Sequence, residues 1–176
     1  RAQNYLEGKA AGRGWQQEIR FHLATGHEVT LANTPHPKFN SGGPEALLNG
    51  VNGSDERYGD EEWLGFSGED CLATIDLGTA KEINEVAFRF FKGEGQWIYL
   101  PAQVVVAASE DGTAFTEIGR LEQVTGASKV VSPRITFPAI TTRYLRIEIK
   151  NFGIIPQGQQ GAGNASWLFV DEISVK

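Results

Sequence analysis

The amino-acid sequence predicts an all-β fold, a sandwich or jelly roll of about eight short strands. Apolar and polar side chains alternate along most of the chain, which is the two-residue period of a strand rather than the 3.6-residue period of a helix. Glycine supplies 21 of the 176 residues, an excess that suits many tight turns. No long segment has a convincing helical pattern, so the expected strands must pack against one another.

Four expected strands precede the turn signal Ser109-Glu-Asp-Gly112. Residues 29–32 alternate between apolar and polar side chains, and residues 73–77 place alanine, isoleucine and leucine on one face. Residues 86–91 carry apolar side chains on both faces, which indicates a strand covered on both sides. Residues 103–108 are almost continuously apolar, as in the centre of a sheet.

Four more expected strands follow the turn. Residues 114–118 return beside the preceding strand as the second arm of a hairpin. Residues 129–137 form an extended stretch that Pro133 interrupts, and residues 143–150 alternate between apolar and polar side chains. Residues 167–175 close the chain. Eight short strands separated by turns are typical of a sandwich.

The chain is organised as one β module behind a short lead-in. Residues 1–25 are interrupted by glycines and are expected to be a lead-in or linker segment from a preceding domain, whereas residues 26–176 are expected to be the module. Residues 38–70 are rich in glycine and polar residues and show little periodicity. An irregular connection of that length is usually functional or held by a bound ion, so we expect function to lie there.

Charge and composition exclude several classes of function. The chain has 22 acidic and 16 basic residues, a net charge of −6, and lacks the basic stripe that phosphate binding requires, so we expect no nucleic-acid partner. It also lacks an apolar run of roughly 20 residues, so we expect no membrane span. The single cysteine, Cys71, cannot form an internal disulfide and fits a small residue packed in a strand.

The sequence offers little for catalysis, and we expect that this chain is not an enzyme. Its adjacent acidic pairs would point to opposite faces of a strand rather than flank one bond. The three histidines lie before residue 40 without the spacing of a zinc site. The sequence contains no nucleophile elbow, phosphate-binding loop or dinucleotide fingerprint.

A site for a hard cation is the first candidate for function. Calcium takes about six to eight oxygen ligands, many of them carbonyl groups, which a turning glycine-rich backbone can aim inward. The alternative is a solvent-facing turn, because Asn, Asp and Gly also tolerate positive φ angles. The spacing leaves both interpretations open. The oxygen-bearing side chains crowded between residues 46 and 60 are Asn49, Asn52, Ser54, Asp55 and Asp60.

Aromatic residues in glycine-rich connections are the second candidate. Sugars present flat C–H faces that pack on aromatic rings, while a few fixed polar groups bind their hydroxyls. Tyr58 and Trp63 lie in the long connection, and Trp97 and Trp167 each follow a glycine-rich turn. Arg89 could supply hydrogen bonds to a sugar. Each tryptophan could equally belong to the core, and the sequence leaves that choice open.

The order of several motifs resembles one known family. The motifs are Ala46-Leu-Leu-Asn-Gly50, Trp63-Leu-Gly-Phe-Ser-Gly68, Thr74-Ile-Asp-Leu-Gly78, Trp97-Ile-Tyr-Leu-Pro101, Arg143-Tyr-Leu-Arg-Ile147 and Trp167-Leu-Phe-Val-Asp-Glu-Ile173. Together they resemble the coagulation factor 5/8 type C (discoidin-like) domain over residues 26–176. The stretch from Phe152 to Trp167 is similar to the C-terminal module of bacterial family 20 β-N-acetylhexosaminidases.

The resemblance implies a galactose-binding-like jelly roll, akin to the family 32 carbohydrate-binding modules. Such modules commonly hold one structural calcium ion between the loop that matches residues 46–60 and a carboxylate near the last strand. The family often has Asp-Gly where this chain has Asn49-Gly50, and the missing charge makes calcium weaker or absent. The calcium ligands implied here are Asn49, Asn52, Asp60 and Glu172.

The function that the resemblance implies is carbohydrate binding without catalysis. The expected role is an accessory module of a bacterial, β-N-acetylhexosaminidase-like glycoside hydrolase that is secreted, periplasmic or at the cell surface. Its expected partners are glycans ending in galactose or an N-acetylhexosamine, and the catalytic domain of the same parent chain. The alternatives are a discoidin-type adhesion module for a protein or lipid surface and a ligand-free structural domain. The residues expected to bind sugar are Trp97, Trp63, Tyr58, Trp167 and Arg89.

Overall fold

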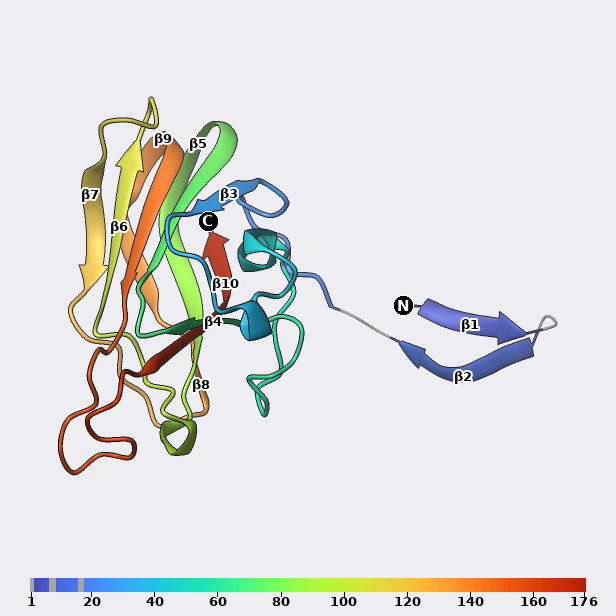
Figure 1. Cartoon of the computed structure of the whole chain (residues 1–176). Helices are drawn as coiled ribbons and strands as arrows, with labels where there is room; N and C mark the ends of the chain where they lie inside the picture. The colour runs from blue at the N-terminus through green and yellow to red at the C-terminus, as the bar shows by residue number, and fades with distance from the viewer. Residues whose placement is uncertain (1, 7–8, 16–17) are drawn as a thin grey trace.

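The computed structural model describes residues 2–6, 9–15 and 18–176 (Figure 1). Strands β1 (Ala2–Leu6) and β2 (Lys9–Trp15) pair antiparallel in a small sheet of their own. The other residues of the expected lead-in before residue 18 lie outside the described part of the chain.

Eight further strands form one continuous sheet that folds into a sandwich. They are β3 (Glu28–Leu31), β4 (Leu64–Ser67), β5 (Cys71–Phe91), β6 (Gln103–Ser109), β7 (Thr116–Leu121), β8 (Val130–Val131), β9 (Arg134–Lys150) and β10 (Trp167–Val175). Their order in the sheet is β4-β10-β5-β9-β6-β7, and β3 and β8 also pair with β5. All of these strand pairings are antiparallel. The all-β prediction and the expected number of strands are confirmed.

Two long strands, β5 and β9, carry the sheet from one layer of the sandwich to the other (Figure 1). The first half of β5 pairs with β3 and β9, whereas its second half pairs with β9, β10 and β8. The register shifts between Asp76 and Lys81, where Gly78 has a φ of 76°. The separate strands expected at residues 73–77 and 86–91 are therefore one bulged strand, because the glycine bends the ladder without ending it.

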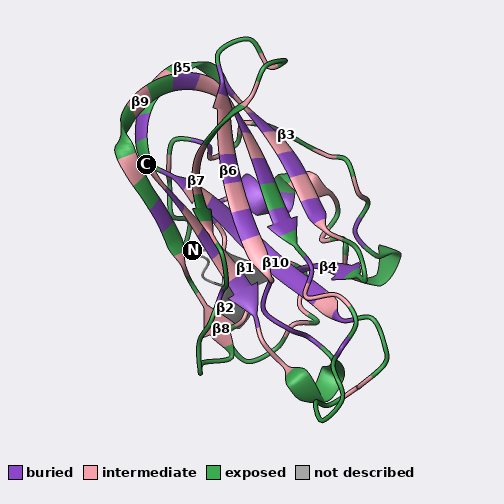
Figure 2. Cartoon of the chain, turned by 90° about the vertical axis from the view of Figure 1, so that its left-hand side faces the viewer, coloured by how far each residue is buried: buried purple, intermediate pink, exposed green. Residues whose placement is uncertain are grey.

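Alternating burial along the strands builds the core between the layers (Figure 2). Along β5 from Cys71 to Leu77, every second residue is buried. Cys71 is fully buried, and its burial raises the pKa of the thiol to about 12. Burying a Leu, Ile, Val or Phe side chain contributes about 1.5–3 kcal/mol relative to exposure, so this alternation is the main source of stability.

The long segment of residues 38–70 is more ordered than its pattern indicates. The 3₁₀ turn η1 (Pro37–Phe39) lies at its start, and it contains the 3₁₀ turn η2 (Pro44–Leu48) and strand β4. The turn η2 buries Ala46, Leu47 and Leu48 in the core. Such elements are too short to show a period, which explains why the pattern missed them. In the described residues, no helical segment has the length and apolar character needed to cross a membrane.

The chain just before β3 is attached to the sandwich by backbone hydrogen bonds. Arg20 N donates to Gly50 O at 2.8 Å, and Leu23 N donates to Val175 O at 2.9 Å. These bonds join this segment both to the loop after η2 and to the end of β10.

Candidate functional site

Trp97 presents an exposed indole, with 41% of its surface accessible. It follows the 3₁₀ turn η3 (Glu94–Gln96) and adopts a left-handed backbone with a φ of 64°. Its backbone N–H donates to Glu94 O at 2.9 Å, and its backbone carbonyl accepts from Trp167 N at 2.8 Å. A large residue in this conformation is strained by about 1–3 kcal/mol, and such strain concentrates at functional sites. The backbone bonds keep Trp97 in this strained position.

The indole lies against the loop between β9 and β10. This loop is at the lower end of the sandwich in Figure 1. A Cβ atom added to Gly161 would lie 2.4 Å from Trp97 Cδ1, and Gly161 itself has a φ of 86°. Glycine at this position therefore allows the loop to approach the ring. Tyr99 donates its hydroxyl hydrogen to Gln160 O at 2.8 Å, so the connection between η3 and β6 is joined to the loop close to Trp97 in the sequence.

A groove of about 620 Å³ is lined by residues on both sides of Trp97 in the sequence, by the β9–β10 loop and by residues 122–126 after β7, although Trp97 itself does not line it. Tyr99 and Phe152 stack in its wall, with ring centroids 4.8 Å apart and an interplanar angle of 18°. Lys92 and Glu94 form an ion pair of 3.1 Å at the groove, and Gln159 adds an amide. Aromatic surface with a few polar groups, in a groove of this size, suits one small ligand.

A second groove, of about 710 Å³, lies along the long segment where function was expected. Its lining includes the carboxylates of Glu45, Asp60, Glu61 and Glu62, together with the ring of Phe39. Acidic side chains of this kind are well hydrated, and they offer little apolar area for a ligand to cover. We therefore assign the candidate binding surface to Trp97 and its neighbours rather than to this groove.

Trp63, expected on a binding rim, is instead completely buried. Its ring meets Phe91 edge-on at a centroid distance of 5.4 Å, and its Nε1 donates to Ser54 O at 3.2 Å. A Cβ atom on Gly53 would lie 2.4 Å from this Nε1, so the loop is packed directly onto the indole. Trp63 supports the loop from within and is not available to stack on a sugar.

Tyr58 and Trp167 are half-buried members of an aromatic cluster. The ring centroid of Tyr58 lies 5.2 Å from that of Phe169, and that of Trp167 lies 5.5 Å from that of Phe39, both edge-to-face. Tyr58 also lines a small cavity of about 250 Å³ together with Gln96 of η3. These rings brace the loops around Trp97 more than they project from them.

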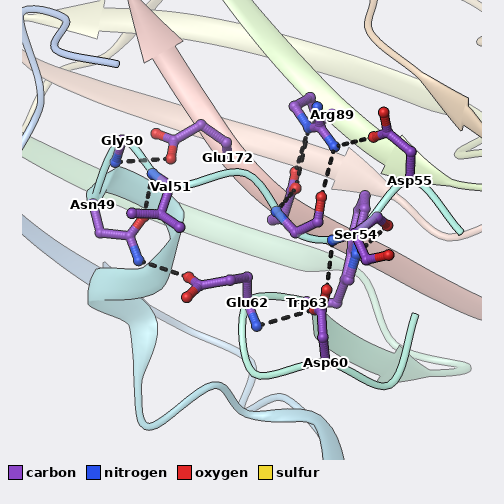
Figure 3. A network of polar contacts seen from close by, with 12 residues as sticks. Asn49, Gly50, Val51, Ser54, Asp55, Asp60, Glu62, Trp63, Arg89 and Glu172 are labelled. Atoms are coloured by element: carbon purple, nitrogen blue, oxygen red, sulfur yellow. Dashed lines mark hydrogen bonds and ion pairs between the residues drawn. The ribbon is translucent and has the colours of Figure 1, made fainter. Parts of the chain in front are cut away.

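Arg89, expected to bind sugar hydroxyls, is turned into the protein, and 16% of its side chain is exposed (Figure 3). Its guanidinium pairs with the fully buried Asp171 at 3.1 Å and with Asp55 at 2.8 Å, and donates to Gly53 O at 3.2 Å. Burial raises the pKa of Asp171 to about 7, and the nearby Arg89 acts in the opposite direction. Arg89 therefore fastens the loop of residues 53–55 to β10.

Two of the loop residues expected to bind calcium, Asn49 and Asp60, use their side-chain oxygens to accept hydrogen bonds (Figure 3). Asn49 Oδ1 accepts from Val51 N at 2.7 Å, and the Asn49 amide donates to Glu62 at 2.9 Å. Asp60 accepts from Ser54 N at 2.5 Å and from Glu62 N at 3.2 Å. Asn52 is half-buried in the same loop. These contacts fold the loop on itself.

Glu172, the fourth expected ligand, is also occupied by donors. Its Oε2 accepts from Gly50 N at 2.9 Å, and its Oε1 lies 2.9 Å from His22 Nε2. Burial raises the pKa of Glu172, and burial lowers the pKa of His22 to about 4. In the described residues, no group of three or more His, Cys, Asp and Glu side chains is placed to hold a metal ion. The residues present therefore do not fit calcium, because N–H donors face the side-chain oxygens of Asn49, Asp60 and Glu172.

The sequence analysis missed several residues of the Trp97 surface and of the surroundings of Glu172. Tyr99, Phe152 and Gly161 take part in the Trp97 surface, and His22 contacts Glu172. The glycines after Gly158 were a visible signal of a special loop, but the sequence does not say which ring they approach. His22 is one of the three histidines without the spacing of a zinc site, and its partner Glu172 lies 150 residues away in the chain.

The comparisons with known proteins agree with the observed fold. A family model described as F5/8 type C domain matches residues 29–171. Among curated proteins no match was found. The expected resemblance to this family is confirmed.

Solved structures share the same architecture. Chitosan-binding module 1 of a chitosanase/glucanase from Paenibacillus sp. IK-5 is 16% identical with a TM-score of 0.58, and the match covers 89% of this chain and 99% of that one. CpGH89CBM32-5 from Clostridium perfringens, in complex with GalNAc-β-1,3-galactose, is 14% identical with a TM-score of 0.55, covering 88% and 99%. A Ruminococcus gnavus GH29 fucosidase is 14% identical with a TM-score of 0.55, covering 88% of this chain and 26% of that one.

At these identities the solved structures show the fold, a galactose-binding-like jelly roll. The family model matches from β3 into β10 and so spans nearly the whole sandwich. The chain therefore belongs to the F5/8 type C domain family.

Proposed function

We propose that this chain is a carbohydrate-binding module that binds sugar at Trp97. The observation that carries the proposal is the exposed indole, held in a left-handed conformation between η3 and Gly161. A rigid aromatic face loses little conformational entropy on binding, and it matches the apolar C–H face of a pyranose ring. Trp97 is thus the stacking platform.

The adjoining groove supplies the polar half of the site. The Glu94 carboxylate accepts hydrogen bonds from sugar hydroxyls, and the Gln159 amide both donates and accepts them. Phe152, which is half-buried and stacks on the buried Tyr99, adds apolar contact area. Such an open site holds one or two sugar units, so we expect a dissociation constant on the order of 1 mM or somewhat below.

The proposed ligand is a glycan that ends in galactose or an N-acetylhexosamine. One of the solved structures, in complex with GalNAc-β-1,3-galactose, supports this class of ligand, and the one described as chitosan-binding supports glycan binding more generally. Both are similar to this chain over their whole length. The sugar-binding role proposed for Trp97 is independent of which of these sugars binds best.

The module's proposed setting is a bacterial glycoside hydrolase outside the cytoplasm, of the β-N-acetylhexosaminidase kind. The fucosidase match supports such an arrangement, because this fold makes up 26% of that longer chain. In this proposal the catalytic domain of the parent chain cleaves the bond, and the present chain keeps it close to the glycan.

The test is binding to a glycan array, followed by titration calorimetry with the best ligand. The expected result for Trp97→Ala is loss of measurable binding with only a small change in melting temperature, because the ring is partly exposed and lies outside the core clusters. Ile154→Ala is the matched control, since Ile154 is an exposed apolar residue of the neighbouring loop with 65% of its surface accessible. It should bind like the wild type.

Two outcomes would overturn the proposal. Trp97→Ala that binds as well as the wild type would remove the platform from the mechanism. A wild-type protein that binds lipid vesicles or proteins but no glycan would favour an adhesion module instead.

A further inference from the structure

We propose that His22 takes the structural place of a metal ion in this module, by joining the chain before β3, the loop after η2 and strand β10 around Glu172. The module then needs no calcium for its stability. The inference is independent of glycan binding, because its tests read stability and the state of one imidazole ring.

The contact between His22 and Glu172 is buried and specific. The two side chains are each 4% exposed, and His22 Nε2 lies 2.9 Å from Glu172 Oε1. His22 Nδ1 lies 3.2 Å from Ala24 N and 3.3 Å from Val175 N, which are both donors. Nδ1 must therefore be the acceptor, so the ring proton sits on Nε2 and is donated to Glu172.

The loop on the other side of Glu172 is closed by the same segment. Gly50 N donates to Glu172 Oε2 at 2.9 Å, while Gly50 O accepts from Arg20 N at 2.8 Å. A Cβ atom on Gly50 would lie 2.8 Å from Arg20 O, so the two backbones are in direct contact. Both polar groups of Gly50 are thus used, one by the acidic side chain and one by the segment that carries His22.

Donors already occupy side-chain oxygens that an ion would need. Calcium takes about six to eight oxygen ligands, and a buried carboxylate needs either such a cation or hydrogen-bond donors. Glu172 has donors at both oxygens, and the Asn49 carbonyl oxygen is held by Val51 N. A cation bound to Glu172 would have to displace His22 and turn the Gly50 N–H away from the carboxylate. An imidazole N–H and a backbone N–H do the work of holding the strand to the loop.

The first experiment measures the melting temperature of the full chain with excess EGTA and with millimolar calcium. We expect the same value in both. His22→Ala should lower it by about 5 °C, because it leaves Glu172 buried with one donor fewer. His36→Ala is the control, since His36 is exposed; its Nδ1 accepts one hydrogen bond, from Lys38 N at 3.2 Å, and it has no buried carboxylate as a partner, so its loss should cost clearly less. His22→Gln, whose amide can donate to Glu172, should recover part of the loss.

Three results would overturn the inference. One is a wild-type melting temperature that EGTA lowers and calcium restores. The second is a loss in His22→Ala no larger than in His36→Ala.

The third comes from long-range ¹⁵N–¹H correlation spectra of the wild-type protein, which report the tautomer without any variant. We expect the proton on Nε2 of His22. A proton on Nδ1 would mean that His22 does not donate to Glu172.

Discussion

Glycine residues in the β9–β10 loop offer a way to separate backbone strain from contact with Trp97. Gly161 and Gly163 have φ angles of 86° and 85°, so alanine strains the backbone similarly at both positions. Only at Gly161 would the new Cβ meet the indole, at 2.4 Å; at Gly163 nothing lies within 4 Å. We expect Gly161→Ala to weaken glycan binding at least about tenfold, a change of ~1.4 kcal/mol.

Calorimetry on both variants checks this expectation. Gly163→Ala should lose a similar amount of stability and keep its affinity. Equal affinities in the two variants would show that the position of the ring does not matter for binding.

The same scale shows where sequence reasoning stops. Trp63 and Trp97 both stand in glycine-rich connections, yet one is completely buried and the other is 41% exposed. The difference comes from what packs on each ring. Gly53 and Phe91 pack on Trp63, whereas Gly161 of the β9–β10 loop packs on Trp97. Such contacts depend on how separate segments fold onto each other and on single backbone angles. No local sequence pattern encodes either of them.

At the scale of elements, the pair of Arg89 and Asp171 fastens a loop to β10. Removing Arg89 leaves the carboxylate of Asp171 buried without its cation, and breaking such a pair costs about 3 kcal/mol. We expect Arg89→Ala to lower the free energy of unfolding by that amount at pH 8. Arg134→Ala is the control, because Arg134 is 65% exposed, lies 3.5 Å from Glu85, and should cost less than about 1 kcal/mol.

The cost of Arg89→Ala should depend on pH. Burial already raises the pKa of Asp171 to about 7, above its value in the unfolded chain, and loss of Arg89 raises that pKa further. The folded variant therefore holds the proton more tightly than the unfolded chain, and its stability falls as the pH rises from 4 toward 8. Urea unfolding at pH 5 and pH 8 should give the smaller loss at pH 5. An equal loss at both would mean that Asp171 stays ionised throughout.

The elements themselves were largely predictable. The period-two patterns located β3, β6 and β10 within a few residues, because each of these strands buries one face or both. The joining of residues 73–77 and 86–91 into β5 was not predictable, since a glycine can end a strand or bend it and only the pairing with β9 decides.

At the scale of the whole molecule, the acidic net charge provides a test of what kind of glycan binds. The charge is −6, but Lys92 and Glu94 pair with each other at the proposed groove. A neutral sugar stacked on Trp97 gains little from long-range electrostatics. Its affinity should therefore change less than about twofold between low salt and 1 M salt, although the Debye length falls to about 3 Å at 1 M.

A glycan that carries protonated amino groups, such as chitosan, is attracted by the whole acidic surface and should bind more weakly as salt is added. Calorimetry with N-acetylated and deacetylated oligomers of the same length, at both salt concentrations, distinguishes the two cases. A steep salt dependence for the neutral oligomer would contradict stacking on Trp97 as the main source of affinity, because contact between apolar surfaces is not weakened by screening.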